Sequence, residues 1–162
     1  MTQAAALKLD KAETPETFES ELLGVVPLRP EQIITFPEGI VGFPDARRYA
    51  LLPASREGFY WLQSLDHEPL AFVLIDPFVF VPGYSVELGS NELGPLDTDD
   101  PGDLAVLAIL ALPREPGDLP TVNLQGPVAV NLKRRLGRQV ILAESPYGTR
   151  WPLELKRRRK AS

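Results

Sequence analysis

The only histidine of the chain stands among side chains that could do acid–base chemistry. Ser64, Asp66, His67 and Glu68 lie close together, so a hydroxyl, an imidazole and two carboxylates share one short stretch. A catalytic histidine takes a proton from a hydroxyl while a third group orients its ring. Neighbours on a strand point to opposite faces, and neighbours in a turn fan outward, so the two flanking carboxylates cannot orient His67. We interpret the stretch as a polar turn that ends at Pro69.

Other patterns that could carry chemistry are weak. Ser64 or Ser145 could still meet His67 through folding, which keeps a small hydrolase open as an alternative. One histidine and no cysteine exclude the common zinc sets, disulfides and a cysteine nucleophile. DTDDPGD, residues 97–103, resembles a calcium loop, but Ala108 stands where the closing glutamate belongs. We therefore expect no enzymatic activity, no cofactor and no metal.

The elements that must position these residues are predicted to be short strands. Segments rich in β-branched and aromatic residues alternate with Pro, Gly, Asp and Asn. They are residues 31–36, 46–52, 59–64, 70–75, 84–88, 104–112, 121–124, 127–131 and 138–143. The 17 prolines leave little room for long helices. The pattern predicts an all-β domain that closes as a barrel or sandwich, with 104–112 as a central strand buried on both faces.

The two ends of the chain differ from this body. We expect residues 1–29 to form a flexible N-terminal extension, with a short helix over 15–23 as the alternative, and 30–155 to form one domain. Residues 156–162 begin with KRRRK and are predicted to be a basic tail. No secretory signal is visible, and the longest apolar run has nine residues, whereas a membrane-spanning helix needs roughly 20. We expect a cytoplasmic protein.

Charge is distributed unevenly. Residues 1–103 carry 6 basic and 18 acidic side chains, and the remainder carries 11 basic and 4 acidic ones. An acidic body favours a basic protein partner and disfavours nucleic acid. The densest acidic stretch is a solvated loop or a docking patch, formed by Glu87, Glu92, Asp97, Asp99, Asp100 and Asp103. The alternative is a small β-barrel that binds nucleic acid through Lys133, Arg134, Arg135, Arg138 and the tail.

The order of these segments resembles a known family. ITFPEGIVGFPDARRYALL (33–52), FYWLQSLDHEPLAFVLIDPFVFVPGYSVEL (59–88), TVNLQGPVAVNLKRRLGRQVIL (121–142) and the tyrosine in SPYGTRWPL (145–153) carry the resemblance. The most specific pieces are the WLQS, LAF and DP run and the TVNL, VN and GRQ run. Their shared order and spacing make the sequence similar to the flagellar assembly factor family, FliW.

The resemblance implies a fold, a function and partners. The fold would be a small, buckled β pseudo-barrel. The function would be a non-enzymatic partner switch in the cytoplasm. Members bind the C-terminal region of flagellin and, once free, bind the RNA-binding repressor CsrA, which releases flagellin mRNA for translation. We expect the six acidic residues of 87–103 to face CsrA, no direct contact with nucleic acid or membrane, and a monomer when free. Asn123 and Asn131 are expected to bond backbone groups at strand ends.

Overall fold

The computed structural model describes residues 16–20, 23–67 and 69–154, and strands dominate them. The strands are β1 (Glu16–Ser20), β2 (Gly24–Leu28), β3 (Ile33–Thr35), β4 (Arg48–Pro53), β5 (Phe59–Ser64), β6 (Ala71–Ile75), β7 (Ala105–Ala111), β8 (Thr121–Asn131), β9 (Leu136–Gln139) and β10 (Trp151–Pro152). The helical turns are α1 (Pro77–Phe80), α2 (Ser90–Leu93), η1 (Pro30–Gln32), η2 (Gly94–Leu96) and η3 (Pro101–Asp103). The predicted scarcity of long helices holds for the described residues.

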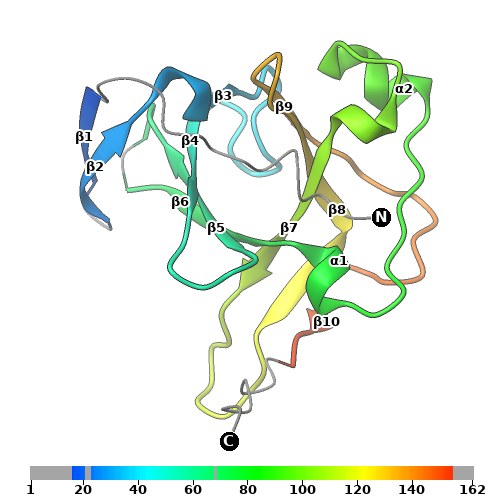
Figure 1. The fold of residues 1–162 in the computed structure, drawn as a ribbon. Coiled ribbons are helices and arrows are strands. Elements are labelled where there is room, and N and C mark those ends of the chain that lie inside the picture. The colour runs from blue at the N-terminus through cyan, green and yellow to red at the C-terminus, as the bar shows by residue number, and fades with distance from the viewer. Residues whose placement is uncertain (1–15, 21–22, 68, 155–162) are drawn as a thin grey trace, which may run out of the picture.

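Seven of the strands close into a barrel (Figure 1). The order runs from β8 through β7, β6, β5, β4 and β3 to β9, and β9 then pairs with β8. All pairs in this ring are antiparallel except β3 with β9, which meet in parallel at Thr35 and Leu136 alone. β10 pairs with the start of β8 outside the ring. The predicted all-β barrel-like fold is confirmed.

The core follows from the alternation of apolar side chains along these strands. Ile34, Leu51, Leu62, Leu74 and Leu107 come from five different strands and are fully buried in one cluster. β7 lies between β6 and β8. Its residues 105–108 are buried on both faces, as expected for a central strand, and burial ends towards Ala111.

Three strand predictions need correction. The predicted strand 138–143 is shifted, since β9 covers 136–139 and residues 140–143 form no strand. The segment 84–88 forms no strand, because Tyr84 and Val86 pack against the aromatic cluster around Trp151 and no strand pairs with the segment. The segments 121–124 and 127–131 are one strand, β8, so Gly126–Pro127 is not a turn between strands. Pro127 is tolerated because the register of β8 with β7 shifts there, at a bulge that needs no donor from proline.

The alternative of a short helix over 15–23 is wrong for the described residues 16–20. The segment 16–20 is a strand instead of part of a helix, and it pairs with β2 in a hairpin. Val26 and Leu28 pack against Ala50, Leu52 and Trp61 on the barrel. Sequence reasoning missed this hairpin because β1, ETFES, offers Phe18 alone as an apolar side chain. Residues 1–15 and the basic tail 156–162 lie outside the described residues.

Candidate functional site

The polar stretch around His67 is a turn held by its own hydrogen bonds. The buried Ser64 hydroxyl accepts hydrogen bonds from the backbone N–H groups of Asp66 (3.2 Å) and His67 (2.9 Å). The Asp66 carboxylate accepts from the N–H groups of Arg47 and Arg48 at 2.7 and 2.9 Å. These two bonds hold the pKa of Asp66 below its usual range. The predicted turn between β5 and β6 is therefore confirmed.

The hydrolase alternative finds no support in this geometry. His67 is exposed to solvent, and no hydroxyl of the described residues bonds to its imidazole. The hydroxyl of Ser145 accepts instead from the N–H of Tyr147 at 3.2 Å. No described group of three or more His, Asp or Glu side chains is arranged to hold a metal ion. Ser64 and His67 thus belong to one local turn, and Ser145 belongs to another.

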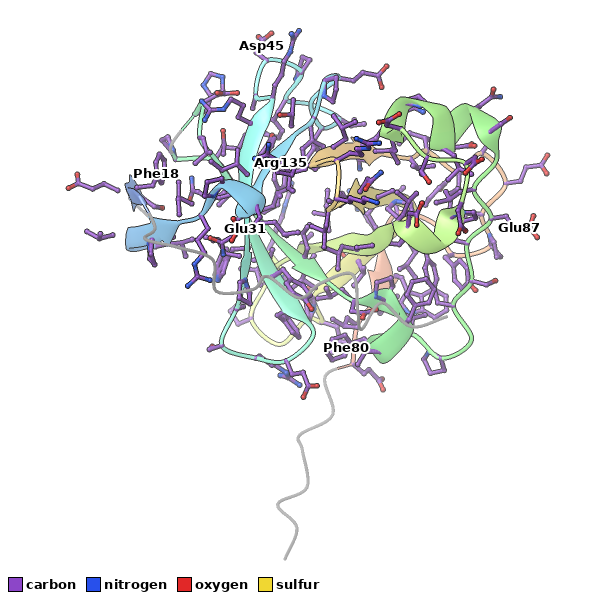
Figure 2. All side chains as sticks on the ribbon, turned by 45° about the horizontal axis from the view of Figure 1, so that its top comes forward. Phe18, Glu31, Asp45, Phe80, Glu87 and Arg135 are labelled. Carbon is purple, nitrogen blue, oxygen red and sulfur yellow. The ribbon has the colours of Figure 1, made fainter. Side chains whose placement is uncertain are left out.

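The six predicted acidic residues lie on the long connection between α1 and β7, residues 81–104, which we call the acidic excursion. Figure 2 shows this part of the chain with Glu87 labelled. Most of the six residues have local structural roles. Asp97 forms a 3.1 Å ion pair with Arg134. Asp100 accepts a hydrogen bond from Gly102 N, and Asp103 accepts one from the Thr98 hydroxyl. Glu92 accepts from Gly89 N at the start of α2. These four carboxylates hold the excursion in shape.

The other two acidic residues differ from these four. Glu87 and Asp99 are exposed and have no hydrogen-bond or ion-pair partner among the described residues. Figure 2 shows Glu87 at the outer edge of the molecule. Of the predicted set, these two carboxylates are the ones free to meet a partner.

The basic cluster after β8 is also engaged in the fold. Besides the ion pair of Arg134 with Asp97, Arg135 donates to the carbonyl of Pro30 at 3.1 Å. Arg138 donates to the carbonyl of Asn91 at 3.0 Å. These contacts favour the interpretation of the cluster as a structural turn over a phosphate-binding patch.

A groove lies beside this cluster, and sequence reasoning did not find it. Its volume is about 420 Å³. It is lined by residues 38–42 and Pro44 of one loop, by Asn91 and Glu92 of α2, and by residues 138–141. The groove therefore joins an apolar loop to the first helix of the acidic excursion.

The GRQ motif holds the walls of the groove in place. Gly137 packs on the buried ring of Phe36, where a Cβ would collide with the ring. Arg138 lies 3.3 Å from Glu38 in an ion pair that is not aligned as a hydrogen bond. Gln139 accepts a hydrogen bond from Val41 N (2.9 Å) and donates one to the carbonyl of Gly126 (3.0 Å). Three successive residues thus fix the loop, α2 and the bulge of β8 relative to one another.

The loop 38–44 turns apolar side chains outward. Ile40 is buried, whereas Val41 is 69% exposed and Phe43 43% exposed. Gly39 has a φ of 67°, and a side chain there would collide with the backbone of Phe43 and Pro44. Ile141, which also lines the groove, is 58% exposed. We call Val41 and Ile141, which both line the groove, its apolar rim.

A second depression of about 390 Å³ lies on the other side of the same loop. It shares Gly42 and Pro44 with the groove and reaches Pro69 and Leu70. The loop therefore stands as a ridge between two hollows. The signal in the sequence was the run IVGFP, which is more apolar than a solvated turn needs to be.

Asn123 and Asn131 both bond backbone groups, as expected, but only Asn131 lies at a strand end, whereas Asn123 lies inside β8. Asn123 accepts from Gly126 N at 2.8 Å across the bulge of β8. Asn131 donates to the carbonyl of Leu96 at 2.8 Å and accepts from Arg134 N. The second asparagine ties the acidic excursion to the end of β8.

No described helix has the length and apolar character to span a membrane. The model of the FliW protein family matches residues 17–153, so the match includes the N-terminal hairpin. The flagellar assembly factor FliW of Treponema denticola is 38% identical over 133 residues, covering 82% of this chain and 89% of that protein. The one of Natranaerobius thermophilus is 40% identical over 131 residues, covering 80% and 87%.

A crystal structure of the flagellar assembly factor FliW superposes with a TM-score of 0.76 at 34% identity. The match covers 85% of this chain and 96% of that one. The family model and the structural match thus each cover most of the chain. The chain belongs to the FliW family of flagellar assembly factors.

Proposed function

We propose that this chain binds the C-terminal region of flagellin in the cytoplasm and, when free of flagellin, binds CsrA as a monomer and releases flagellin mRNA for translation. The family membership supports a role in flagellar assembly. The observation that carries the proposal is that the apolar rim lies beside the acidic excursion. The rim offers an apolar surface and the excursion an acidic one, as two unlike partners require.

The flagellin surface is the groove with its apolar rim. An amphipathic segment places apolar side chains in such a groove and folds as it docks. Val41 and Ile141 both line the groove and are exposed, and exposed aliphatic side chains around a hollow mark an interaction site. Arg138 and Glu92 at the same hollow supply polar groups that fix the orientation of the segment.

The CsrA surface is the outer side of the acidic excursion. Glu87 and Asp99 carry charge that the described residues leave uncompensated. Asp97, Asp100 and Asp103 add to the negative field while they hold the backbone. A negative surface beside a basic RNA-binding protein attracts that protein and repels RNA near it.

Calorimetric titration of the full chain with flagellin tests the first surface. The double variant Val41→Ser, Ile141→Ser is expected to weaken binding about tenfold or more, because side chains at an interface centre dominate affinity. Val25→Ser is the matched control, since Val25 is 66% exposed on the hairpin. Equal loss in both variants, or no binding by the unaltered chain, would refute the flagellin assignment.

Titration with CsrA tests the second surface. Glu87→Gln with Asp99→Asn is expected to weaken binding more at low salt than at high salt, because exposed charges are screened over about 8 Å at physiological ionic strength. Asp45→Asn with Asp118→Asn removes the same charge from exposed positions elsewhere and should change little. Affinity that is the same in both double variants would place the contact outside 87–103.

A further inference from the structure

The end of the barrel away from the groove holds a third hollow, of about 670 Å³. It lies between α1 and β10, which stand together at one end of the molecule in Figure 1. Phe80 and Pro82, at and just after the end of α1, and Trp151 and Pro152 of β10 give it two aromatic rings and two proline rings. Figure 2 shows Phe80 at the opposite end of the molecule from Asp45 of the groove-side loop. We call this hollow the aromatic–proline hollow.

The aromatic walls of this hollow are held in place by the fold. The ring of Phe80 packs edge-on against that of Phe59, with 5.2 Å between the ring centroids. Gly58 lies so close to the Phe80 ring that a Cβ there would collide with it. Trp151 is half-buried, and its ring packs edge-on against that of Tyr147 at 5.7 Å. A partner would therefore meet rings that are already in position, which lowers the entropic cost of binding.

Two donors of the hollow have no hydrogen-bond acceptor among the described residues. The indole N–H of Trp151 donates to none of them. The guanidinium of Arg56 forms no ion pair or hydrogen bond with them and lies 5.3 Å from the centre of the Phe59 ring. Pro82 and Pro152 have no backbone N–H group to offer. The hollow therefore presents its donors on side chains, next to apolar rings.

We propose that the aromatic–proline hollow binds a proline-rich segment of another protein in the polyproline II conformation, with a basic residue of that segment next to Glu154. Polyproline II segments pack their rings into aromatic-lined grooves and lose little entropy on binding. This conformation has no internal hydrogen bonds, so its carbonyl groups can accept from Trp151 and Arg56. The hollow shares no residue with the groove, so this partner adds to those proposed above.

The charges of the lining favour a basic residue in the segment. Among the described residues that line the hollow, Arg56 and Glu154 alone are charged. Arg56 already lies over the Phe59 ring, whereas Glu154 is exposed and has no ion pair with a described residue. A lysine or arginine of the segment would complement the Glu154 carboxylate and fix the direction in which the segment lies.

Other ways of binding a macromolecule fit this hollow less well. An added strand needs backbone N–H groups at a sheet edge, and Pro152 is one of the two residues of β10. A helix bonds its own carbonyls internally, so it would leave the donors of Trp151 and Arg56 without acceptors. A nucleic acid needs cations for its phosphates, and the lining supplies one cation against one anion.

Two-dimensional ¹⁵N NMR of the full chain with synthetic peptides tests the proposal, because two tryptophans give two indole N–H signals. The probes are peptides of about nine prolines with one lysine at one end or at the other. We expect a saturable shift of the Trp151 signal and an unchanged signal from Trp61, which packs against the hairpin β1–β2. A glycine–serine peptide of the same length with the same lysine should bind at least tenfold more weakly.

Two results of this titration would overturn the proposal. One is a Trp151 signal that no proline peptide shifts, and the other is equal binding of the proline and glycine–serine peptides. A Trp151 signal that moves with protein concentration alone would assign the hollow to a second copy of this chain instead. A single-stranded RNA homopolymer that shifts the signal when the peptides do not would assign it to nucleic acid.

Variants measured by calorimetric titration locate the contact. Trp151→Phe keeps an aromatic ring but removes the N–H, and it should weaken binding of the proline peptide severalfold. Glu154→Gln changes an exposed side chain and should weaken binding more at low salt than at high salt. Arg114→Gln with Glu115→Gln is the matched control at exposed positions outside the hollow and should bind as the unaltered chain does. Unchanged affinity in both Trp151→Phe and Glu154→Gln would overturn the proposal.

Discussion

The hydroxyl of Ser20 donates a 2.7 Å hydrogen bond to Oε1 of the buried Gln63. Gln63 belongs to the WLQS run of β5 and directs its amide N–H groups to the carbonyls of Ser64 and Leu70. One side chain of the motif therefore joins the hairpin β1–β2 to the turn that contains His67. Two segments that look unrelated in the sequence share a single buried amide.

Replacing Ser20 by Ala should destabilise the protein by about 1–2 kcal/mol, because the buried Gln63 oxygen loses its hydroxyl donor. The Ser20 hydroxyl also accepts from Leu23 N at 3.0 Å, so the hairpin turn loosens too. Urea denaturation measures the change. Ser55→Ala, at an exposed hydroxyl without a hydrogen bond to the described residues, is the control and should be neutral.

Replacing Asp66 by Asn should reveal an acid-dependent contribution to stability. The pKa of Asp66 is lowered in the fold by the N–H groups of Arg47 and Arg48, whereas an unfolded Asp titrates near pH 3.9. The ionised Asp66 therefore stabilises the fold fully above about pH 4, the pKa of an unfolded Asp. This stabilisation is lost as the pH falls through the lower pKa that Asp66 has in the folded protein. The difference in unfolding free energy between the unaltered chain and Asp66→Asn should therefore shrink as the pH falls below 4.

Urea denaturation at pH 6 and at steps below pH 4 measures this gap. Asp99→Asn should show little difference from the unaltered chain at either pH, since its carboxylate bonds to no described residue. A gap for Asp66→Asn that stays constant with pH would show that the charge of Asp66 has no such role.

Replacing Tyr49 by Phe should leave the protein as stable as before or more stable by up to about 1 kcal/mol at pH 7. The Tyr49 hydroxyl is buried with no hydrogen-bond partner among the described residues, so its removal relieves a desolvation cost. Burial, with a smaller effect of Asp66, raises the pKa of Tyr49 to about 12. Because the folded protein keeps Tyr49 protonated more strongly than the unfolded chain does, the stability of the unaltered protein is unaffected below pH 10 and falls as the pH rises towards 12.

Thermal and urea unfolding at pH 7 and between pH 10 and 12 would measure both effects. Tyr84→Phe is the contrasting variant, since the Tyr84 hydroxyl donates to the carbonyl of Leu124 at 3.4 Å. A large loss of stability in Tyr49→Phe at pH 7 would contradict the finding that its hydroxyl is unpartnered.

Replacing Gln139 by Leu should make the loop that carries Val41 more mobile. The variant loses the bonds to Val41 N and to the carbonyl of Gly126, so the loop 38–44 is no longer tied to β8. Hydrogen exchange at the Val41 amide should accelerate, and flagellin binding should weaken about tenfold. Gln125→Leu, whose side chain bonds to no described residue, serves as the control. Unchanged exchange at Val41 would show that Gln139 does not position the rim.

The barrel could be predicted from the sequence because its signals are local. Prolines separate runs such as LAVLAILAL, and the burial of residues 105–108 on both faces follows from their unbroken apolar character. The role of Asn131 could also be predicted, since a short amide at a strand end bonds nearby backbone. The polar turn at His67 follows the same rule. Asn123 bonds backbone inside β8 instead, at a bulge that the sequence did not indicate.

The groove could not be predicted, because its walls come from distant parts of the chain. Val41 and Gln139 meet across 98 positions, and no periodicity of either segment indicates the partner. An apolar residue in the loop 38–44 looks the same whether it faces the core, as Ile40 does, or solvent, as Val41 does. The roles of the acidic residues were hidden for the same reason, since Asp97 pairs with an arginine from another strand end.

The parallel pair of Thr35 and Leu136 determines when the barrel can become complete during synthesis. β3 leaves the ribosome early, but its partner β9 follows about a hundred residues later. Until Gln139 has emerged, the edge of β3 and the far side of β8 stay open to pairing with other nascent chains. The segment that closes the barrel is also the one that fixes the groove, so a nascent chain gains its interaction surface and loses its exposed edges in the same step.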